Sequence, residues 1–139
     1  MKKIISTTDA PAAIGPYSQA VRAGSLVFCA GQVPLDPQSG QIVSEDITEQ
    51  TKRVLDSVTA ILKAENLTMA NVVKTTVFLA DFGDFAKMNE VYATYFTEKP
   101  PARSTVGVST LPRNARVEIE AIAYDAGNSA GGAASDTSG

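Results

Sequence analysis

The 139-residue chain has no histidine and no tryptophan, and it has one cysteine, Cys29. Histidine is the commonest general base and the commonest metal ligand in proteins, so its absence removes both roles together. Motifs that hold metals, phosphates or dinucleotides, such as Cys-x-x-Cys, Gly-x-x-x-x-Gly-Lys and Gly-x-Gly-x-x-Gly, are also absent. We therefore expect no cofactor and no metal, and we expect any catalysis to use carboxyl, guanidinium and backbone groups with water.

Positive charge is also scarce, because 12 Lys and Arg face 15 Asp and Glu for a net charge of -3. Nonspecific nucleic-acid binding needs many cations, so nucleic acid is not expected to be the main partner. Lys2 and Lys3 precede only Ile4 and Ile5, which is too short a run for the apolar part of a signal peptide. No run reaches the roughly 20 apolar residues of a membrane span. A lone cysteine forms no internal disulfide, and we expect a cytoplasmic protein without membrane contact.

Runs of β-prone residues indicate at least five strands. Residues 23–24, with their glycine, are expected to form the hairpin turn between the first two strands. A further short strand is expected at residues 41–43, after a turn-rich segment. The five runs cover residues 18–22, 26–30, 72–79, 104–108 and 115–124.

Two helices are expected between these strands. Apolar residues recur at helical spacing from Ile47 to about Glu65, and Asp46 followed by Glu49 resembles a capping box. The second helix is expected to be capped by Asp84 and to end at Pro100. Its expected apolar side chains are Phe85, Met88, Val91, Tyr92, Tyr95 and Phe96.

This order of elements predicts a single α+β domain, a mixed sheet with both helices packed on one face. The strands at 26–30 and 72–79 are apolar on both alternations, so the uncovered face of the sheet would expose apolar side chains and serve as an interface. We therefore expect a homo-oligomer. Residues 127–139 are rich in Gly, Ala and Ser and lack apolar periodicity, so we expect a disordered tail after a domain of residues 1–126.

Four segments of the chain stand out as motifs. They are Ala-Ile-Gly-Pro-Tyr-Ser-Gln-Ala at 13–20, Ala-Gly-Gln-Val-Pro at 30–34, Val-Lys-Thr-Thr-Val-Phe at 73–78, and residues 100–123 with Ala-Arg-Ser-Thr-Val and Val-Glu-Ile-Glu. In their order and spacing these segments resemble the signature of the reactive intermediate deaminase family, RidA, also called YjgF, in its archetypal subgroup. The resemblance covers about residues 4–124, and it implies a chorismate mutase-like fold and a homotrimer with sites between subunits.

Arg103 and Glu118 are the candidate catalytic residues. The planar fork of Arg103 matches a carboxylate, although a structural ion pair is the common role of such an arginine when the residue is judged alone. Glu118 alternates with Glu120 on one face of a strand, a pattern that by itself indicates a solvated face. The resemblance implies that Arg103 anchors a substrate carboxylate and that Glu118 positions or activates water. For Glu120 the alternation pattern stands, and we expect a solvated residue.

The resemblance also implies substrate-binding roles for Tyr17, Ala30, Gly31, Asn89 and Thr105. Judged alone, Tyr17 is typical of a core or interface tyrosine, and Asn89 of a solvated helix position. Many family members carry cysteine where this chain has Thr105, and serine where it has Ala30. Roles of those side chains are lost here, whereas main-chain contacts at Ala30, Gly31 and Thr105 survive substitution. Cys29 is expected to be a buried core thiol.

The implied activity is that of a 2-iminobutanoate/2-iminopropanoate deaminase. Such an enzyme hydrolyses 2-aminoacrylate, 2-aminocrotonate and their imino forms to 2-keto acids and ammonia, a form of metabolite damage control. Two alternatives stay open: a non-catalytic trimer that binds small carboxylates or acts as a chaperone, and, less favoured by the acidic composition, an endoribonuclease or translation inhibitor. The sequence does not choose among the imino acids.

Overall fold

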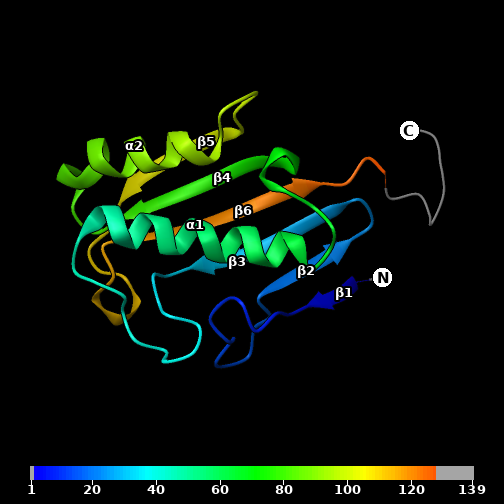
Figure 1. Cartoon of the computed structure of the whole chain (residues 1–139), viewed down its shortest axis with the longest axis horizontal. Coiled ribbons are helices and arrows are strands. Elements are labelled where there is room, and N and C mark those ends of the chain that lie inside the picture. Colours follow the sequence, from blue (N-terminus) through cyan, green and yellow to red (C-terminus); the bar gives the residue numbers. More distant parts are fainter. Residues whose placement is uncertain (1, 128–139) are drawn as a thin grey trace.

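A computed structural model describes residues 2–127 of the chain, so the expected tail lies, apart from Gly127, outside the described residues. Six strands form one sheet in the order β1-β2-β3-β6-β4-β5. Helices α1 (Ile47–Lys63) and α2 (Phe85–Tyr95) lie on the same side of it (Figure 1). The strands are β1 (Lys2–Ile5), β2 (Ala20–Ala23), β3 (Leu26–Gln32), β4 (Val72–Leu79), β5 (Ala102–Gly107) and β6 (Val117–Tyr124).

The predicted single α+β domain with a mixed sheet is confirmed. Strands β4 and β5 pair in parallel, and the other neighbouring strands pair antiparallel. Strand β6 lies between β3 and β4, so the connection through α1 joins two strands that are parallel but not adjacent. The strands differ from the sequence expectations at two places. The short strand expected at residues 41–43 is only an isolated bridge between Leu35 and Ile42, and β1 was not predicted because only its last residue, Ile5, is buried.

Helix α1 begins as its sequence predicts but with a different set of capping bonds. The Asp46 carboxylate accepts a hydrogen bond from the Glu49 backbone N–H at 3.0 Å. The Asp46 backbone N–H donates to the Ser44 hydroxyl at 2.9 Å, so Ser44 takes the place that Glu49 would have in a capping box. The helix then buries an apolar stripe against the sheet, which includes Val54, Leu55, Val58, Ile61 and Leu62.

Helix α2 begins after Asp84, but Asp84 does not cap it through its side chain. Its carboxylate instead accepts hydrogen bonds from Nε and Nη2 of Arg116, at 3.0 and 2.9 Å. Asp84 therefore occupies the expected N-cap position without capping the helix through its side chain, because a guanidinium fork binds both carboxylate oxygens better than one backbone N–H does. This ion pair joins the start of α2 to the residue that precedes β6. The helix ends at Tyr95, before the expected stop at Pro100.

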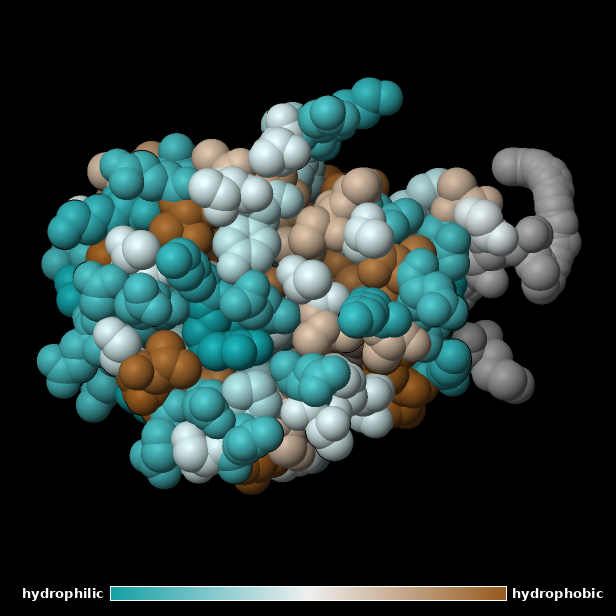
Figure 2. All heavy atoms as spheres, viewed as in Figure 1, coloured by the Kyte–Doolittle hydropathy of each residue, from teal (hydrophilic) through white to brown (hydrophobic). Residues whose placement is uncertain are grey.

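The hydrophobic core lies between the helices and the sheet. Along β6, Val117, Ile119, Ala121 and Ala123 are buried on the helix side, and Glu118 and Glu120 alternate onto the other, open face. The open face also exposes apolar side chains, namely Leu26, Phe28, Val106 and Tyr124. The helix side in Figure 2 is, in contrast, largely hydrophilic. Among residues 2–127, neither helix combines the length and apolar composition needed to cross a membrane.

Candidate active site

Arg103 lies on the edge strand β5, on the face that the helices cover. Its register partner on β4 is Thr75, which is 1% exposed and shares a 2.6 Å hydrogen bond with the hydroxyl of Tyr92 on α2. The Arg103 guanidinium donates from Nη1 to Oδ1 of Asn89 at 2.7 Å. Helix α2 therefore holds the guanidinium, and the predicted site residues Arg103 and Asn89 lie side by side.

The Arg103 guanidinium has no carboxylate partner in the part of the chain that the structure describes. Arg22 and Arg116, in contrast, each pair with a carboxylate, at N–O distances of 2.8 and 2.9 Å. The bond to Asn89 uses the Nη1 donor of Arg103, and its Nε and Nη2 donors form no hydrogen bond with residues 2–127. The structural ion pair that is the common alternative for such an arginine is thus not formed within the chain. The open edge of the guanidinium is suited to a carboxylate from another molecule.

Thr105 follows two residues after Arg103 and lies on the same face, opposite Val77 of β4. Its hydroxyl oxygen is buried and has no hydrogen-bond partner among the described residues. An unpartnered buried hydroxyl costs stability because it has lost its bonds to water. At Thr105 only main-chain contacts with a substrate were expected, and the structure shows that its side-chain hydroxyl is also without a partner among the described residues.

Replacing Thr105 with valine, which has nearly the same shape, should remove this cost. We expect Thr105→Val to raise the free energy of unfolding by about 1 kcal/mol. Chemical denaturation of both proteins measures the change, with Thr76→Val on the neighbouring strand as the control for a threonine–valine exchange. A loss of stability in Thr105→Val would show that the hydroxyl has a partner in solution.

Glu118 lies on the open face of β6 and leans over Gly31 of β3. A Cβ atom at position 31 would collide with the Glu118 carboxylate and lie 2.9 Å from its Cδ, so glycine there lets the Glu118 side chain keep this position. Burial, and after it the negative charge of Glu120, raise the pKa of Glu118 above its usual value. A carboxyl group with a raised pKa is suited to proton transfer near neutral pH.

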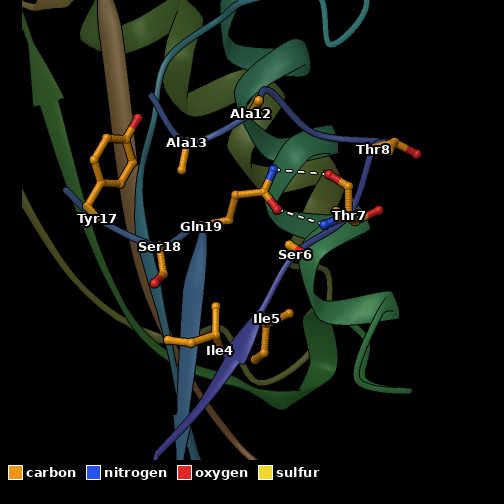
Figure 3. Close-up of a pocket in the computed structure, with 10 residues that line it drawn as sticks. All are labelled: Ile4, Ile5, Ser6, Thr7, Thr8, Ala12, Ala13, Tyr17, Ser18 and Gln19. Carbon is orange, nitrogen blue, oxygen red and sulfur yellow. Dashed lines mark hydrogen bonds between the residues drawn. The ribbon is translucent and has the colours of Figure 1, made fainter. Parts of the chain in front are cut away.

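Tyr17 lies on the loop that joins β1 to β2. It lines a cavity of about 620 Å³ together with Ser18 and Gln19 (Figure 3). The residue is 55% exposed, and its hydroxyl accepts a long hydrogen bond, 3.4 Å, from the Ile14 N–H. Ala30 on β3 donates from its backbone N–H to the Gln19 carbonyl at 2.9 Å. The loop of Tyr17 is thus tied to the β3 segment that carries Ala30 and Gly31.

Gln19 is a residue whose role sequence reasoning missed. Its side chain is 4% exposed and accepts from the Thr7 N–H at 2.7 Å (Figure 3). Its amide group donates to the carbonyls of Thr7, Ala10 and Pro11, at 3.1, 3.3 and 2.7 Å. One buried amide therefore holds the irregular loop in shape, which explains a glutamine within the motif at residues 13–20.

The predicted site residues fall on two opposite faces of the sheet. Residues in register on neighbouring strands share a face of the sheet. Arg103 is in register with Thr75, so it lies on the helix side, and Thr105 lies on the same side because it is in register with Val77. Glu118 is in register with Phe78 and lies on the open side, with Gly31. The structure thus brings Arg103, Asn89 and Thr105 together, and separately Glu118 and Gly31. A single chain does not bring Arg103 to Glu118.

The acidic side chains and the thiol of Cys29 are the other groups that could bind a metal or act as a nucleophile. Within residues 2–127, no cluster of three or more Cys, Asp or Glu side chains is placed to share a metal ion. Cys29 is 5% exposed, as predicted for a core thiol. Burial raises the pKa of its thiol to about 12, which keeps it protonated and unreactive.

Comparisons with known proteins agree with the motifs. Residues 7–125 match the family described as Endoribonuclease L-PSP. The Mus musculus 2-iminobutanoate/2-iminopropanoate deaminase is 54% identical over 123 residues, which are 88% of this chain and 91% of the mouse protein. E. coli TdcF, solved with bound serine, is 46% identical with a TM-score of 0.86, over 89% of this chain and 99% of TdcF. The E. coli YjgF gene product is 46% identical with a TM-score of 0.84, over 88% and 98%.

The fold and the site define a single-domain α+β protein whose sheet carries an unpaired arginine on one face and a carboxyl group with a raised pKa on the other. The family match covers residues 7–125, most of the chain. The chain belongs to the RidA/YjgF family, as its motifs predict.

Proposed function

We propose that this protein is an enamine/imine deaminase that hydrolyses 2-aminoacrylate, 2-aminocrotonate and their imino forms to 2-keto acids and ammonia in the cytoplasm. The name of the mouse relative supports this reaction. The serine bound to TdcF supports a pocket for a small amino-acid carboxylate. The 2-imino acids are of the same size and carry the same carboxylate.

The observation that carries this proposal is the unpaired guanidinium of Arg103. A buried or half-buried charge is costly unless it is paired, and this one has only the neutral amide of Asn89 at hydrogen-bond distance. A substrate carboxylate would supply the missing charge through two parallel hydrogen bonds to Nε and Nη2. The main-chain groups of Ala30, Gly31 and Thr105 are proposed to contact the same substrate, and Tyr17 to close the pocket.

The chemistry requires one water molecule and transfers of protons only. The oxygen of water attacks the electrophilic imine carbon, the carboxylate of Glu118 takes a proton from this water, and it returns the proton to the nitrogen. The C–N bond then breaks, the nitrogen leaves as ammonia with the hydroxyl proton, and the oxygen remains as the keto oxygen. Glu118 ends in its starting state, and a carboxyl with a raised pKa suits both transfers.

We propose that the complete site forms between two copies of the chain in a homotrimer. Arg103 and Glu118 lie on opposite faces of one sheet, so one substrate would contact both only if the two residues came from different subunits. The exposed apolar side chains of the open face, among them Phe28 and Val106, each 41% exposed, are suited to such an interface. A head-to-tail contact repeated three times closes into a ring with three equal sites.

The reaction is tested by measuring the release of 2-keto acid and ammonia from 2-aminoacrylate that a serine dehydratase generates in situ. We expect the protein to accelerate release above the spontaneous rate. The same rate with and without the protein, despite measurable binding of 2-oxobutanoate, would favour the alternative of a non-catalytic carboxylate-binding trimer.

The family description also names an endoribonuclease, and this activity needs its own control. A net charge of -3 and the lack of histidine give little support to RNA binding or cleavage. Incubation of nuclease-free protein with labelled RNA should leave the RNA intact. Cleavage that is lost in Arg103→Ala would instead support a ribonuclease.

A further inference from the structure

Helix α2 surrounds the Arg103 guanidinium with three side chains from one face. Phe85, Asn89 and Tyr92 are spaced at i, i+4 and i+7, so they form a single row along the helix. The central carbon of the guanidinium lies 4.7 Å from the ring centroid of Tyr92 and 5.5 Å from that of Phe85. Both distances fall within the range of cation–π contacts.

This arrangement leaves one edge of the guanidinium available. A ring stacked on a guanidinium occupies its flat face and leaves the N–H groups in the plane unblocked. Asn89 occupies Nη1, and no hydrogen bond among the described residues occupies Nε or Nη2. These two donors form the parallel pair that a carboxylate accepts side-on.

Tyr92 is itself held in place more firmly than its neighbours on the row. Its side chain is 5% exposed, and its hydroxyl shares a 2.6 Å hydrogen bond with Thr75, a buried residue of β4. Its ring centroid lies 4.6 Å from that of Phe96. Thr75 is also the register partner of Arg103, so the ring and the guanidinium that it contacts are anchored to the same point of the sheet.

We propose that Tyr92, anchored by Thr75, is a positioning residue that presets the Arg103 guanidinium so that its Nε–Nη2 edge receives the substrate carboxylate. This inference rests on the proposed function, and it assigns to Tyr92 a role that the chain's motifs do not indicate. The ring limits the rotamers of the arginine before the ligand arrives, so less conformational entropy is lost on binding. Tyr92 acts through Arg103 and takes no part in the proton transfers.

The test compares two ligands that differ only in charge, 2-oxobutanoate and 2-oxobutanamide, by calorimetric titration of the full-length protein. We expect Tyr92→Leu to weaken binding of the carboxylate about five- to thirtyfold, the range of a desolvated cation–π contact, and to change binding of the amide less than twofold. Tyr92→Phe keeps the ring and is expected to stay within about threefold of the wild type. Tyr95→Leu, on the same helix but bonded to Asp56, should leave both affinities unchanged.

A double-mutant cycle separates positioning from a general structural role. In an Arg103→Ala background, Tyr92→Leu should have no further effect on carboxylate binding, because the group that it positions is absent. Equal losses for both ligands, or a loss that persists without Arg103, would overturn the inference. If Tyr92→Leu does not fold, Thr75→Val, alone and combined with Tyr92→Phe, tests the hydrogen bond between Thr75 and Tyr92. The double variant should be no weaker than either single one, and additive losses would count against the proposal.

The outcome is separable from that of the proposed reaction. Suppose that the wild type binds the carboxylate better than the amide, that Tyr92→Leu loses this preference, and that the wild type does not accelerate imine hydrolysis. The positioning role of Tyr92 would then stand, and the proposed deaminase activity would be wrong. If the wild type accelerates hydrolysis and Tyr92→Leu has the same kcat and KM, the proposed deaminase activity would stand and the positioning role of Tyr92 would be wrong.

Discussion

Arg103→Ala is expected to lower kcat/KM for 2-iminobutanoate by about a hundred- to twenty-thousandfold. Two charge-assisted hydrogen bonds to the substrate carboxylate would be lost, each contributing about 1.5–3 kcal/mol. The coupled assay for 2-keto acid release measures this change over a series of substrate concentrations. The variant should fold, because Arg103 forms no ion pair with another residue in the described chain, and its removal leaves no buried carboxylate without a partner.

Two further variants distinguish the effect of the planar guanidinium group from the effect of a positive charge alone. Arg103→Lys keeps the positive charge but offers no planar fork, so it should recover only a small part of the lost activity. Lys87→Ala removes a cation from the exposed side of the same helix, α2, and should behave as the wild type. Full activity in Arg103→Lys would show that the site needs only a point charge. Full activity in Arg103→Ala would remove the arginine from the mechanism altogether.

Glu118→Gln is expected to lower kcat by about a hundred- to ten-thousandfold, the usual contribution of a general acid–base group, while ligand binding is largely kept. The amide has nearly the same shape as the carboxyl group and still fits above Gly31, but it neither takes nor returns a proton. Steady-state kinetics measures kcat, and titration with 2-oxobutanoate measures binding. Glu120→Gln, the neighbouring carboxyl on the same face, should keep its turnover.

The pH dependence provides a second measurement of the same group. The Glu118 carboxylate is the proposed base, and its pKa is raised, so activity should fall as the pH drops through this raised value. Glu120→Gln removes the nearby negative charge, which lowers the pKa of Glu118 and moves the acid limb to lower pH. An acid limb that is unchanged in Glu120→Gln would mean that another group titrates there.

Mixing the two inactive proteins tests whether each site draws on two subunits. If Arg103 comes from one subunit and Glu118 from the next, random trimers of Arg103→Ala and Glu118→Gln chains contain intact sites at about a quarter of their interfaces. Co-refolding of equal amounts should therefore restore about a quarter of the wild-type rate, whereas either variant alone remains inactive. No recovery from a mixture shown to contain mixed trimers would place both residues in one subunit's site.

The sequence predicted the elements of this fold better than the position of each functional group. Alternation along residues 115–124 correctly placed Glu118 and Glu120 on the face opposite the buried Val117. Local spacing does not reveal that Arg103 faces the helices, because a short edge strand without a fully buried residue has no clear inner side. The separation of Arg103 from Glu118 depends on strand register, which is set by pairing between distant segments.

Other features escaped prediction because tertiary contacts replaced a local one. Asp84 stands where a helix cap is expected, but Arg116 from a distant segment binds its carboxylate. Tyr92 appeared in the sequence only as one apolar residue of a helix stripe. Its contacts with Thr75 and Arg103 depend on the packing of α2 against β4 and β5, which helical periodicity does not specify.

The place of β6 in the sheet has a consequence for how the chain folds. Residues 117–124 come after all the other strands in sequence, yet they lie between β3 and β4. A nascent chain that has emerged only as far as β5 would therefore hold two half-sheets, each with an unpaired inner edge that attracts other strands. The sheet can close only when this last strand arrives. Ribosome stalling or truncation before residue 117 should for this reason yield an aggregation-prone fragment rather than a smaller folded protein.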